Sequence, residues 1–211
     1  IEEALKICDQ SGQGEVVIVS MGPERVQKVI REALAKGAHR GIHVVTSSTE
    51  LTDPLTTASA LANALKEEGF DLILSGLQSD DMGYGQTGVI LGEMLNMSTA
   101  TLAMSTEVSN DTIKVKRELE AGYFQWTTMS LPASISVQSG CNTPRYPSLK
   151  GIMGAKKKDI AQINFDSGSV HQAVKKLYPP NNSKETIMIE GPTDQIVEKL
   201  VDVLKNEIKI A

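Results

Sequence analysis

Residues Asp71–Gly88 read DLILSGLQSDDMGYGQTG, a short apolar run followed by a glycine-rich loop. The run Asp71–Leu74 has the composition of a buried strand, and a helical pattern follows from about Gln86 to Leu95. A strand, a glycine-containing turn and a helix in this order form one step of a strand–helix alternation. This stretch therefore points to the fold class and also marks the first candidate site.

The chain before this stretch repeats the same alternation. Strand-like runs occupy Glu15–Ser20 and Gly41–Val45, and a helical pattern follows each of them. Pro23 suits the start of the first helix, and Thr52, Asp53 and Pro54 suit the start of the second. Strands separated by helices of this length predict a parallel sheet covered on both faces. Such sheets bind ligands at the carboxyl ends of their strands, where the glycine-rich loop lies.

Four further strand-like runs follow the loop and its helix. They are Ala100–Val108, Thr112–Leu119, Tyr123–Met129 and Ala133–Gln138. No linker composition separates them from the first half, so we expect them to add antiparallel pairing to the same sheet. The expected fold class is α/β: a three-layer sandwich with a mainly parallel, Rossmann-like sheet plus antiparallel additions and a C-terminal arm. Residues 1–160 should form the α/β domain, and residues 161–211 the arm, with a terminal helix from Pro192.

Composition excludes several classes of function. The 211 residues have a net charge of −5 at pH 7, which gives no general affinity for nucleic acid. No stretch reaches the roughly 18 apolar residues that span a bilayer, so no membrane insertion is expected. His39 and His43 have the spacing of a metal-binding pair, but Gly41 between them argues against the helix that such a pair needs. Cys8 and Cys141 are expected to be ordinary thiols.

The loop Ser75–Gly88 is suited to hold a phosphate group. Its glycines let the backbone approach a ligand, and the amides of Gln86, Thr87 and Gly88 open the next helix, where an anion is favoured. Thr87 can add a hydroxyl donor. The loop lacks the lysine of GxxxxGK[ST] and the spacing of GxGxxG, and a tight turn accounts for its glycines as well as a ligand does.

Other conspicuous side chains have plainer explanations. Asp80 and Asp81 are better suited to cap loop amides than to act as an acid–base pair, because no base or nucleophile accompanies them. Tyr123 and Trp126 lie in a predicted strand, where aromatic side chains normally form core or cross-strand contacts. Residues 1–7, IEEALKI, fit the middle of a helix, so we expect further chain before them.

Residues Asn142–Lys158, NTPRYPSLKGIMGAKKK, are irregular in pattern and basic at their end. They place an apolar group, Leu149, Ile152 and Met153, beside a run of three lysines. An apolar group with a cationic rim is the composition of a transient protein-docking site. A surface loop with a solvated lysine run fits the same residues, and composition alone does not decide between the two.

Several segments together resemble the electron-transfer flavoprotein β subunits. Val115–Val137, VKRELEAGYFQWTTMSLPASISV, is similar to the signature segment of that family, and Asn142–Lys158 to its N-x-P-R-Y-x-[ST]-L…I-M-x-A-K-K-K stretch. Shorter matches are DDMGYGQTG (80–88) with D-x-x-x-x-Q-T-G, SMGP (20–23) with S-x-G-P, and ALAKGAHRGIHV (33–44) with A-L-A-x-G-A-x-R-G-I-H-V. The resemblance runs from Ile1 to about Lys158 and is weaker beyond.

The resemblance implies an adenine-nucleotide-binding α/β sandwich and an electron carrier that makes no bonds of its own. It implies a heterodimer in which the α subunit holds the redox-active FAD and this chain holds a structural AMP. The AMP phosphate would lie on Gly85, Gln86 and Thr87. The full set of nucleotide-binding residues that it implies is Met21, Gly76, Gln78, Ser79, Asp80, Asp81, Gly83, Tyr84, Gly85, Gln86, Thr87 and Gly88.

The resemblance also implies a docking site for redox partners. Leu149 matches the anchor that inserts into acyl-CoA dehydrogenases and related flavin dehydrogenases. The whole docking set is Leu149, Ile152, Met153, Lys156 and Lys157. One inserted leucine contributes about 2 kcal/mol, which orients a partner without holding it. A quinone oxidoreductase would be the later electron acceptor, and the terminal helix would pack on the α subunit.

Some features depart from the family pattern. Ala121 stands where the signature usually has glycine or an acidic residue, and Gly154 replaces a common lysine. The family's opening strand precedes Ile1, so part of the adenine pocket lies outside this sequence. Two alternatives stay open: a bifurcating-type β subunit with a second FAD in place of AMP, and a free-standing adenine-nucleotide sensor. The resemblance fits the bacterial cytoplasm and the mitochondrial matrix equally.

Overall fold

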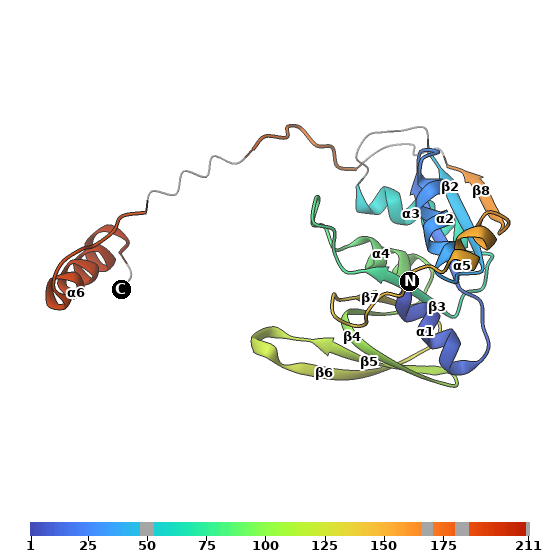
Figure 1. Ribbon diagram of the computed structural model, residues 1–211, viewed down its shortest axis with the longest axis horizontal. Helices are drawn as coiled ribbons and strands as arrows, with labels where there is room; N and C mark the ends of the chain where they lie inside the picture. The colour runs from blue at the N-terminus through green and yellow to red at the C-terminus, as the bar shows by residue number, and fades with distance from the viewer. Residues whose placement is uncertain (47–52, 166–170, 180–185, 210–211) are drawn as a thin grey trace. The chain divides into compact units, whose positions relative to one another are not determined.

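The chain divides into two compact units, Ile1–Val174 and Lys175–Ala211. Figure 1 shows the ribbon of each. The computed structural model describes residues 1–46, 53–165, 171–179 and 186–209. The first unit holds both the glycine-rich loop and the lysine-rich stretch, so the candidate sites lie in one unit.

The first unit alternates helices and strands along its sequence. Its described strands are β1 (Val17–Gly22), β2 (Arg40–Val45), β3 (Leu72–Gly76), β4 (Ser98–Ser109), β5 (Thr112–Glu118), β6 (Phe124–Ser130), β7 (Ala133–Val137) and β8 (Ile160–Asn164). Its described helices are α1 (Glu2–Ser11), α2 (Val26–Ala35), α3 (Pro54–Leu65), α4 (Thr87–Met94) and α5 (Leu149–Ala155), with a 3-10 turn at Glu120–Gly122. This order confirms the predicted strand–helix alternation of the first half.

Two hydrogen-bonded sheets are present where one was expected. The first runs β1–β2–β8 with parallel pairing, and the second runs β3–β7–β4–β5–β6. The predicted antiparallel additions occur at β4–β5 and β5–β6. They extend the sheet of β3, whereas β1 and β2 pair with β8 instead. The α/β class, with mainly parallel pairing and antiparallel additions, is confirmed.

The strand β7 differs from the antiparallel pairing expected for it. It pairs in parallel with β3 on one side and with β4 on the other. Its residues Ala133–Ser136 are all buried, as is typical of a strand with neighbours on both sides and cover on both faces. A short buried run does not reveal in its sequence the direction of the strands beside it, because that direction depends on the chain path.

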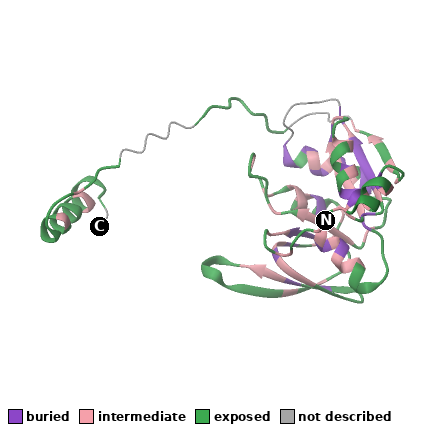
Figure 2. Ribbon diagram, viewed as in Figure 1, coloured by how far each residue is buried: buried purple, intermediate pink, exposed green. Residues whose placement is uncertain are grey.

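Helices cover both faces of the strands and complete the three layers. Within β1, Ile18 packs on the cluster around Ile30 of α2, whereas Val19 packs on the cluster around Ile42 of β2 and Leu91 of α4. The second cluster also takes in residues of α3 and β3, so it joins the two sheets. Figure 2 shows the buried residues concentrated where these helices meet the strands.

The lysine-rich stretch contains a short helix that its sequence pattern does not predict. Gly151 and Gly154 lie within α5, and glycine disfavours helix. The helix forms because the Ser148 hydroxyl accepts a hydrogen bond from the Gly151 amide at 3.0 Å and because α2 packs against it. The next element, β8, pairs with β2, so the first unit continues to Val174 and past the expected boundary at residue 160.

The aromatic side chains of the signature segment lie on the surface. Tyr123 is 72% exposed and Trp126 43% exposed, so neither belongs to the core. Trp126 lies opposite Lys116 across β5 and β6, and the Lys114 ammonium lies 4.7 Å from its ring centroid. Of the two kinds of packing expected, the structure therefore shows cross-strand contact for Trp126.

The second unit contains one α-helix in its described part, α6 (Thr193–Asp202), which a π-helical turn at Val203–Glu207 continues. Pro192 is its N-cap, which confirms the predicted terminal helix. No residue of α6 is buried, so its apolar stripe lies uncovered. Among all described residues, none of the helices combines the length and the apolar content that crossing a membrane requires.

Asp53 begins α3 as the sequence predicts, and Thr52 lies outside the described residues. The Asp53 carboxylate accepts hydrogen bonds from the amide and the hydroxyl of Thr56, at 2.8 and 2.9 Å. It also accepts from the amides of His171 and Gln172, at 2.8 and 3.3 Å. Asp53 is 2% exposed. Burial raises the pKa of its carboxyl, but the hydrogen bonds outweigh burial and lower the pKa from 3.8 to about 2.

We predict that Asp53→Asn destabilises the first unit by about 2 kcal/mol at pH 7. The folded-state pKa lies below the unfolded-state value, so the contribution of Asp53 is full above about pH 4 and is lost as pH falls towards 2. Urea unfolding at pH 7 and at lower pH measures the difference from wild type, which should shrink on acidification. Asp71→Asn, at an exposed position, should change stability little at either pH. Equal effects of the two substitutions at pH 7 would contradict the assignment.

Candidate functional site

The glycine-rich loop leaves the carboxyl edge of the second sheet. The Leu77 amide donates to the Val137 carbonyl at 3.1 Å, so β3 and β7 end together where the loop begins. The loop turns back on itself at Gly83, whose amide donates to the Ser79 carbonyl at 3.1 Å. Gly83 has a φ of 66°, a left-handed conformation that glycine adopts without strain. The predicted position of the loop, at the carboxyl ends of parallel strands, is therefore confirmed.

The start of α4 leaves its first amides available to an anion. Gln86 is the N-cap residue, and no side chain caps the helix among the described residues. The first amides of a helix have no partner within the helix, and the helix dipole favours negative charge at that end. Thr87 and Gly88, which open α4, are partly exposed. The donors that the sequence predicts for a phosphate thus lie together at one helix end.

Close packing fixes the position of that helix start. A β-carbon on Gly88 would lie 2.2 Å from the Ser75 hydroxyl oxygen, and one on Gly92 would lie 2.5 Å from a methyl carbon of Thr99. Both distances are far below van der Waals contact, so only glycine fits. The Ser134 hydroxyl also donates to the Gly88 carbonyl at 2.9 Å. The first turn of α4 is therefore held against β3 and β7.

Two buried hydroxyls near this helix start lack partners among the described residues. They belong to Ser75 of β3 and Ser136 of β7, which are paired across the two strands. A buried polar group without a hydrogen bond costs about 1–3 kcal/mol, so such groups normally meet water or a ligand. Together with the amides of α4, they add hydrogen-bond donors near this edge, the kind of group that an anion favours.

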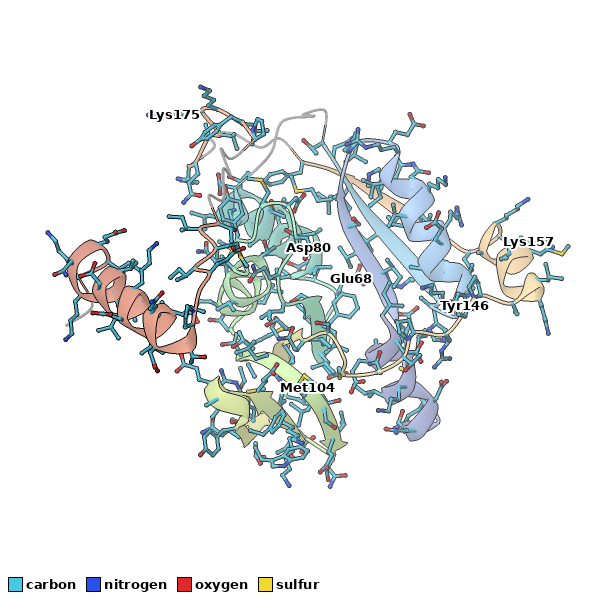
Figure 3. The ribbon with its side chains drawn as sticks, turned by 60° about the vertical axis from the view of Figure 1, so that its left-hand side comes forward. Glu68, Asp80, Met104, Tyr146, Lys157 and Lys175 are labelled. Carbon is cyan, nitrogen blue, oxygen red and sulfur yellow. The ribbon has the colours of Figure 1, made fainter. Side chains whose placement is uncertain are left out.

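The acidic pair of the loop lies on the surface. The Asp81 carboxylate accepts a hydrogen bond from the Met82 amide at 2.7 Å. Hydrogen bonding from the Ser79 hydroxyl, followed by that from Met82, lowers the pKa of Asp81. Asp81 therefore caps the loop as its sequence predicts, while Asp80 stays exposed. Figure 3 labels Asp80.

The remaining residues implied for the nucleotide divide into two groups. Gly76, Gln78 and Tyr84 are exposed on the loop, where a ligand can reach them. Met21 lies on β1 of the other sheet and packs against the cluster of Val44 and its α3 neighbours. The structure thus brings together the loop residues, whereas Met21 lies near the end of β1 in the other sheet.

The two histidines with metal-like spacing bond the backbone instead. His39 Nδ1 accepts from the Val16 amide at 2.9 Å, and buried His43 Nε2 donates to the Gly22 carbonyl at 2.9 Å. In the part of the chain that the structure describes, no three His, Cys, Asp or Glu side chains gather as a metal site would need.

The docking residues predicted from the lysine-rich stretch lie on one projecting helix. Leu149 is 82% exposed and Met153 72% exposed, one helical turn apart, and Ile152 is 45% exposed beside them. Lys156 and Lys157 follow at the end of the helix and are exposed. Figure 3 labels Lys157, and Tyr146 in the segment that precedes the helix. The structure thus presents these apolar and cationic groups together on the surface.

Two arginines and a lysine fix this helix, and the sequence interpretation gave them no role. Arg145 bonds Glu2 at 2.9 Å and Asp9 at 2.8 Å, which ties the segment before α5 to α1. The side-chain hydrogen bond from Arg145 lowers the pKa of Glu2. At the other end, Arg31 of α2 donates to the carbonyls of Ala155 and Lys158.

Lys158 completes a reciprocal arrangement. Its ammonium donates to the carbonyls of Leu34 and Ala38, at the end of α2. Each of the two helices therefore receives a cationic cap from the other, at the end where helix carbonyls lack partners and cations are favoured. The sequence signal was present in the P-R-Y and K-K-K motifs, but the residues that they contact are far away in the chain.

The signature segment contains one strained position. Ala121 has φ 55° and ψ 26°, a left-handed conformation that costs an L-residue about 1–2 kcal/mol. Glycine takes this conformation without strain, so alanine at this position is held by backbone strain.

We predict that Gly151→Ala disturbs the helix α5 and that Gly154→Ala does not. A β-carbon on Gly151 would lie 2.3 Å from the Ala35 carbonyl oxygen, so α5 would have to move off α2. We expect a loss of about 1–3 kcal/mol. A β-carbon on Gly154 meets nothing within 4 Å, so alanine there should stabilise α5 by up to about 1 kcal/mol.

Thermal or urea unfolding of both variants gives the two free-energy changes. The two substitutions add the same methyl group to the same helix, so each is the matched control of the other. Equal effects in the same direction would show that helix propensity, and not contact with α2, governs this site.

The sequence of this chain is similar to those of one known protein family. The family profile described as "Electron transfer flavoprotein domain" matches residues 1–167. The electron transfer flavoprotein subunit beta of Methylophilus methylotrophus is 34% identical over 99% of this chain and 83% of its own length. That of Bradyrhizobium diazoefficiens is 37% identical over 98% of this chain and 82% of its length. The bovine subunit is 34% identical over 96% and 81%.

Proposed function

The chain belongs to the electron transfer flavoprotein family as a β subunit, and we propose that in this role it binds AMP and docks flavin dehydrogenases. The partner subunit would be an α chain that holds most of the FAD. Acyl-CoA dehydrogenases or related flavin enzymes would deliver electrons, and a quinone oxidoreductase would receive them.

The observation that carries the AMP proposal is the uncapped start of α4 at the carboxyl edge of β3. An anion at this point would take the free amides of the first turn, with the Thr87 hydroxyl as a further donor. Gly88 permits the helix to lie against the strand, and the unpartnered Ser75 hydroxyl lies just beneath it. The exposed loop residues Gly76, Gln78 and Tyr84 would surround the nucleoside.

The proposed role of AMP is structural. The loop offers no lysine to a terminal phosphate, and no general base accompanies its two aspartates. Asp81 is engaged with the Met82 amide and Asp80 faces solvent. The residues present therefore bind and position a nucleotide but offer no means of cleaving it.

The docking part of the proposal rests on α5. Leu149 projects from a helix whose two ends are tied to α1 and α2, so little conformational freedom is lost when a partner receives it. When bound, FAD supplies the redox chemistry by accepting electrons from the reduced dehydrogenase. The residues of this chain hold the partner in place and perform no bond-making step.

The uncovered apolar stripe of α6 supports an arm that binds the α subunit. Ile196 lies in the stripe with Leu200, Val201 and Leu204, and Leu200 is 47% exposed. An amphipathic helix with no cover of its own normally packs on a partner. We place the second unit, Lys175–Ala211, in this role.

We predict that the chain binds AMP far more tightly than adenosine. The phosphate would provide the contacts with α4, so its removal should weaken binding by at least about tenfold. Thr87→Val, which removes only the hydroxyl donor, should weaken AMP binding by about fivefold. Isothermal titration calorimetry of the chain with each ligand measures both effects.

Thr128→Val is the matched control, because Thr128 is exposed on β6. It should bind AMP as the wild type does. Equal affinity for adenosine and AMP would show that the phosphate does not bind at the start of α4. Tight binding of FAD to the chain without its α subunit would favour the bifurcating-type alternative.

We predict that Leu149→Ala raises the KM of the heterodimer for reduced acyl-CoA dehydrogenase by about 30-fold, with little change in kcat. The factor corresponds to about 2 kcal/mol of lost apolar contact. Steady-state flavin reduction, with the α subunit present and the dehydrogenase concentration varied, gives both constants.

Leu55→Ala, at an exposed position on α3, is the control and should leave both constants unchanged. Gel filtration should show that both variants keep the α subunit. An unchanged KM in Leu149→Ala would mean that the helix is not the docking element. A stable chain with no affinity for any α subunit would favour the nucleotide sensor.

A further inference from the structure

A hollow of about 780 Å³ lies between α2 and α5, the helix that carries Leu149. Its apolar lining comes from Ala35, Pro147, Ile152 and Ala155. Its charged lining comes from Lys28, Arg31, Glu32, Lys36 and Lys156. We call this hollow the α2–α5 groove. It lies apart from the glycine-rich loop, so it is not part of the nucleotide site.

The charges of the groove are unbalanced. Arg31 is engaged with the carbonyls of Ala155 and Lys158, and it serves the fold. Lys28, Lys36 and Lys156 make no ion pair with any described residue, and Glu32 is the acidic residue of the lining. The groove thus presents an apolar floor with a surplus of uncompensated positive charge, in a chain whose net charge is negative.

The groove is continuous with the proposed docking surface. Ile152 lines it and lies one turn after Leu149, on the same side of a helix only seven residues long. Lys156 lines it from the end of that helix. A protein that receives Leu149 in a pocket must therefore also lie over the groove, because both features belong to the same small area.

We propose that the α2–α5 groove receives an acidic surface segment of the electron-donating flavin dehydrogenase, with apolar residues on the floor and carboxylates against the lysines. This inference rests on the proposed function and adds to it the chemistry of the partner. Complementary charge at the rim of an interface mainly raises the association rate, whereas a buried apolar anchor slows dissociation. The groove therefore steers the dehydrogenase into the orientation in which Leu149 can insert.

The test uses single charge reversals in the heterodimer with its α subunit, with an acyl-CoA dehydrogenase reduced by its substrate as the probe. Lys28→Glu and Lys36→Glu should each raise the KM about threefold at low salt and leave kcat unchanged. Glu32→Lys, in the same groove, should lower the KM by a similar factor. At about 0.5 M salt all three should approach wild type, because exposed charges are then screened.

Lys66→Glu is the control, since it changes net charge equally at an exposed position after α3. If Lys28→Glu and Glu32→Lys shift the KM in the same direction, or no more than Lys66→Glu, the groove inference is overturned. Should Leu149→Ala still raise the KM in that case, the proposed function stands without the groove. Should the wild-type heterodimer accept no electrons from the dehydrogenase, the proposed function itself fails.

Two further results would assign the groove to another occupant and overturn the inference. One is loss of the α subunit from Lys28→Glu on gel filtration, which would make the groove part of the subunit interface. The other is binding of the heterodimer to phosphatidylserine vesicles that Lys28→Glu abolishes, which would make it a lipid contact. If the inference is correct, the Lys28→Glu variant keeps its α subunit, and the wild-type heterodimer does not bind the vesicles.

Discussion

Both candidate sites depend on helices that lie closer to the core than any side chain permits. The start of α4 touches β3 at Gly88, where a β-carbon would lie 2.2 Å from the Ser75 hydroxyl oxygen. The helix α5 touches α2 at Gly151, where a β-carbon would lie 2.3 Å from the Ala35 carbonyl oxygen. A close-packed interior cannot absorb even one extra methyl group at such points without movement. The distance between helix and core therefore determines where the first amides of α4 and the side chain of Leu149 stand.

Polar contacts add to packing in holding α5 in place. Arg145 fixes the chain before it to α1, and the exchange of caps between Arg31 and Lys158 fixes its end to α2. Seven residues that include two glycines would not form a stable helix alone, because nucleation is costly and glycine disfavours helix. With both ends tied, the backbone that carries Leu149 is ordered during folding, so a partner that docked there would lose little further backbone entropy.

Sequence reasoning succeeded where the signal is local. Asp53 before Pro54 predicted the start of α3, and DLIL followed by glycines predicted the strand, loop and helix of the candidate nucleotide site. It failed where partners are distant in the chain. The sequence of residues 133–137 does not indicate that β7 inserts in parallel between β3 and β4. The run of three lysines at 156–158 does not indicate that Lys158 caps α2. The helix α5 was missed for the same reason, since packing against α2 adds to the Ser148 cap and compensates for its two glycines.

The arrangement of charge and apolar surface around α5 suits a carrier that must release each partner. Leu149 alone contributes about 2 kcal/mol, far less than the 8 kcal/mol or so of a micromolar complex. In the proposed complex, long-range attraction by Lys28, Lys36 and Lys156 would raise the encounter rate without prolonging the complex, because exposed charges add little to its lifetime. A larger apolar surface would lengthen the complex and slow the exchange between donor and acceptor. The proposed combination of a small rigid anchor and a cationic groove would therefore give orientation and speed together, without the high affinity that electron transfer does not need.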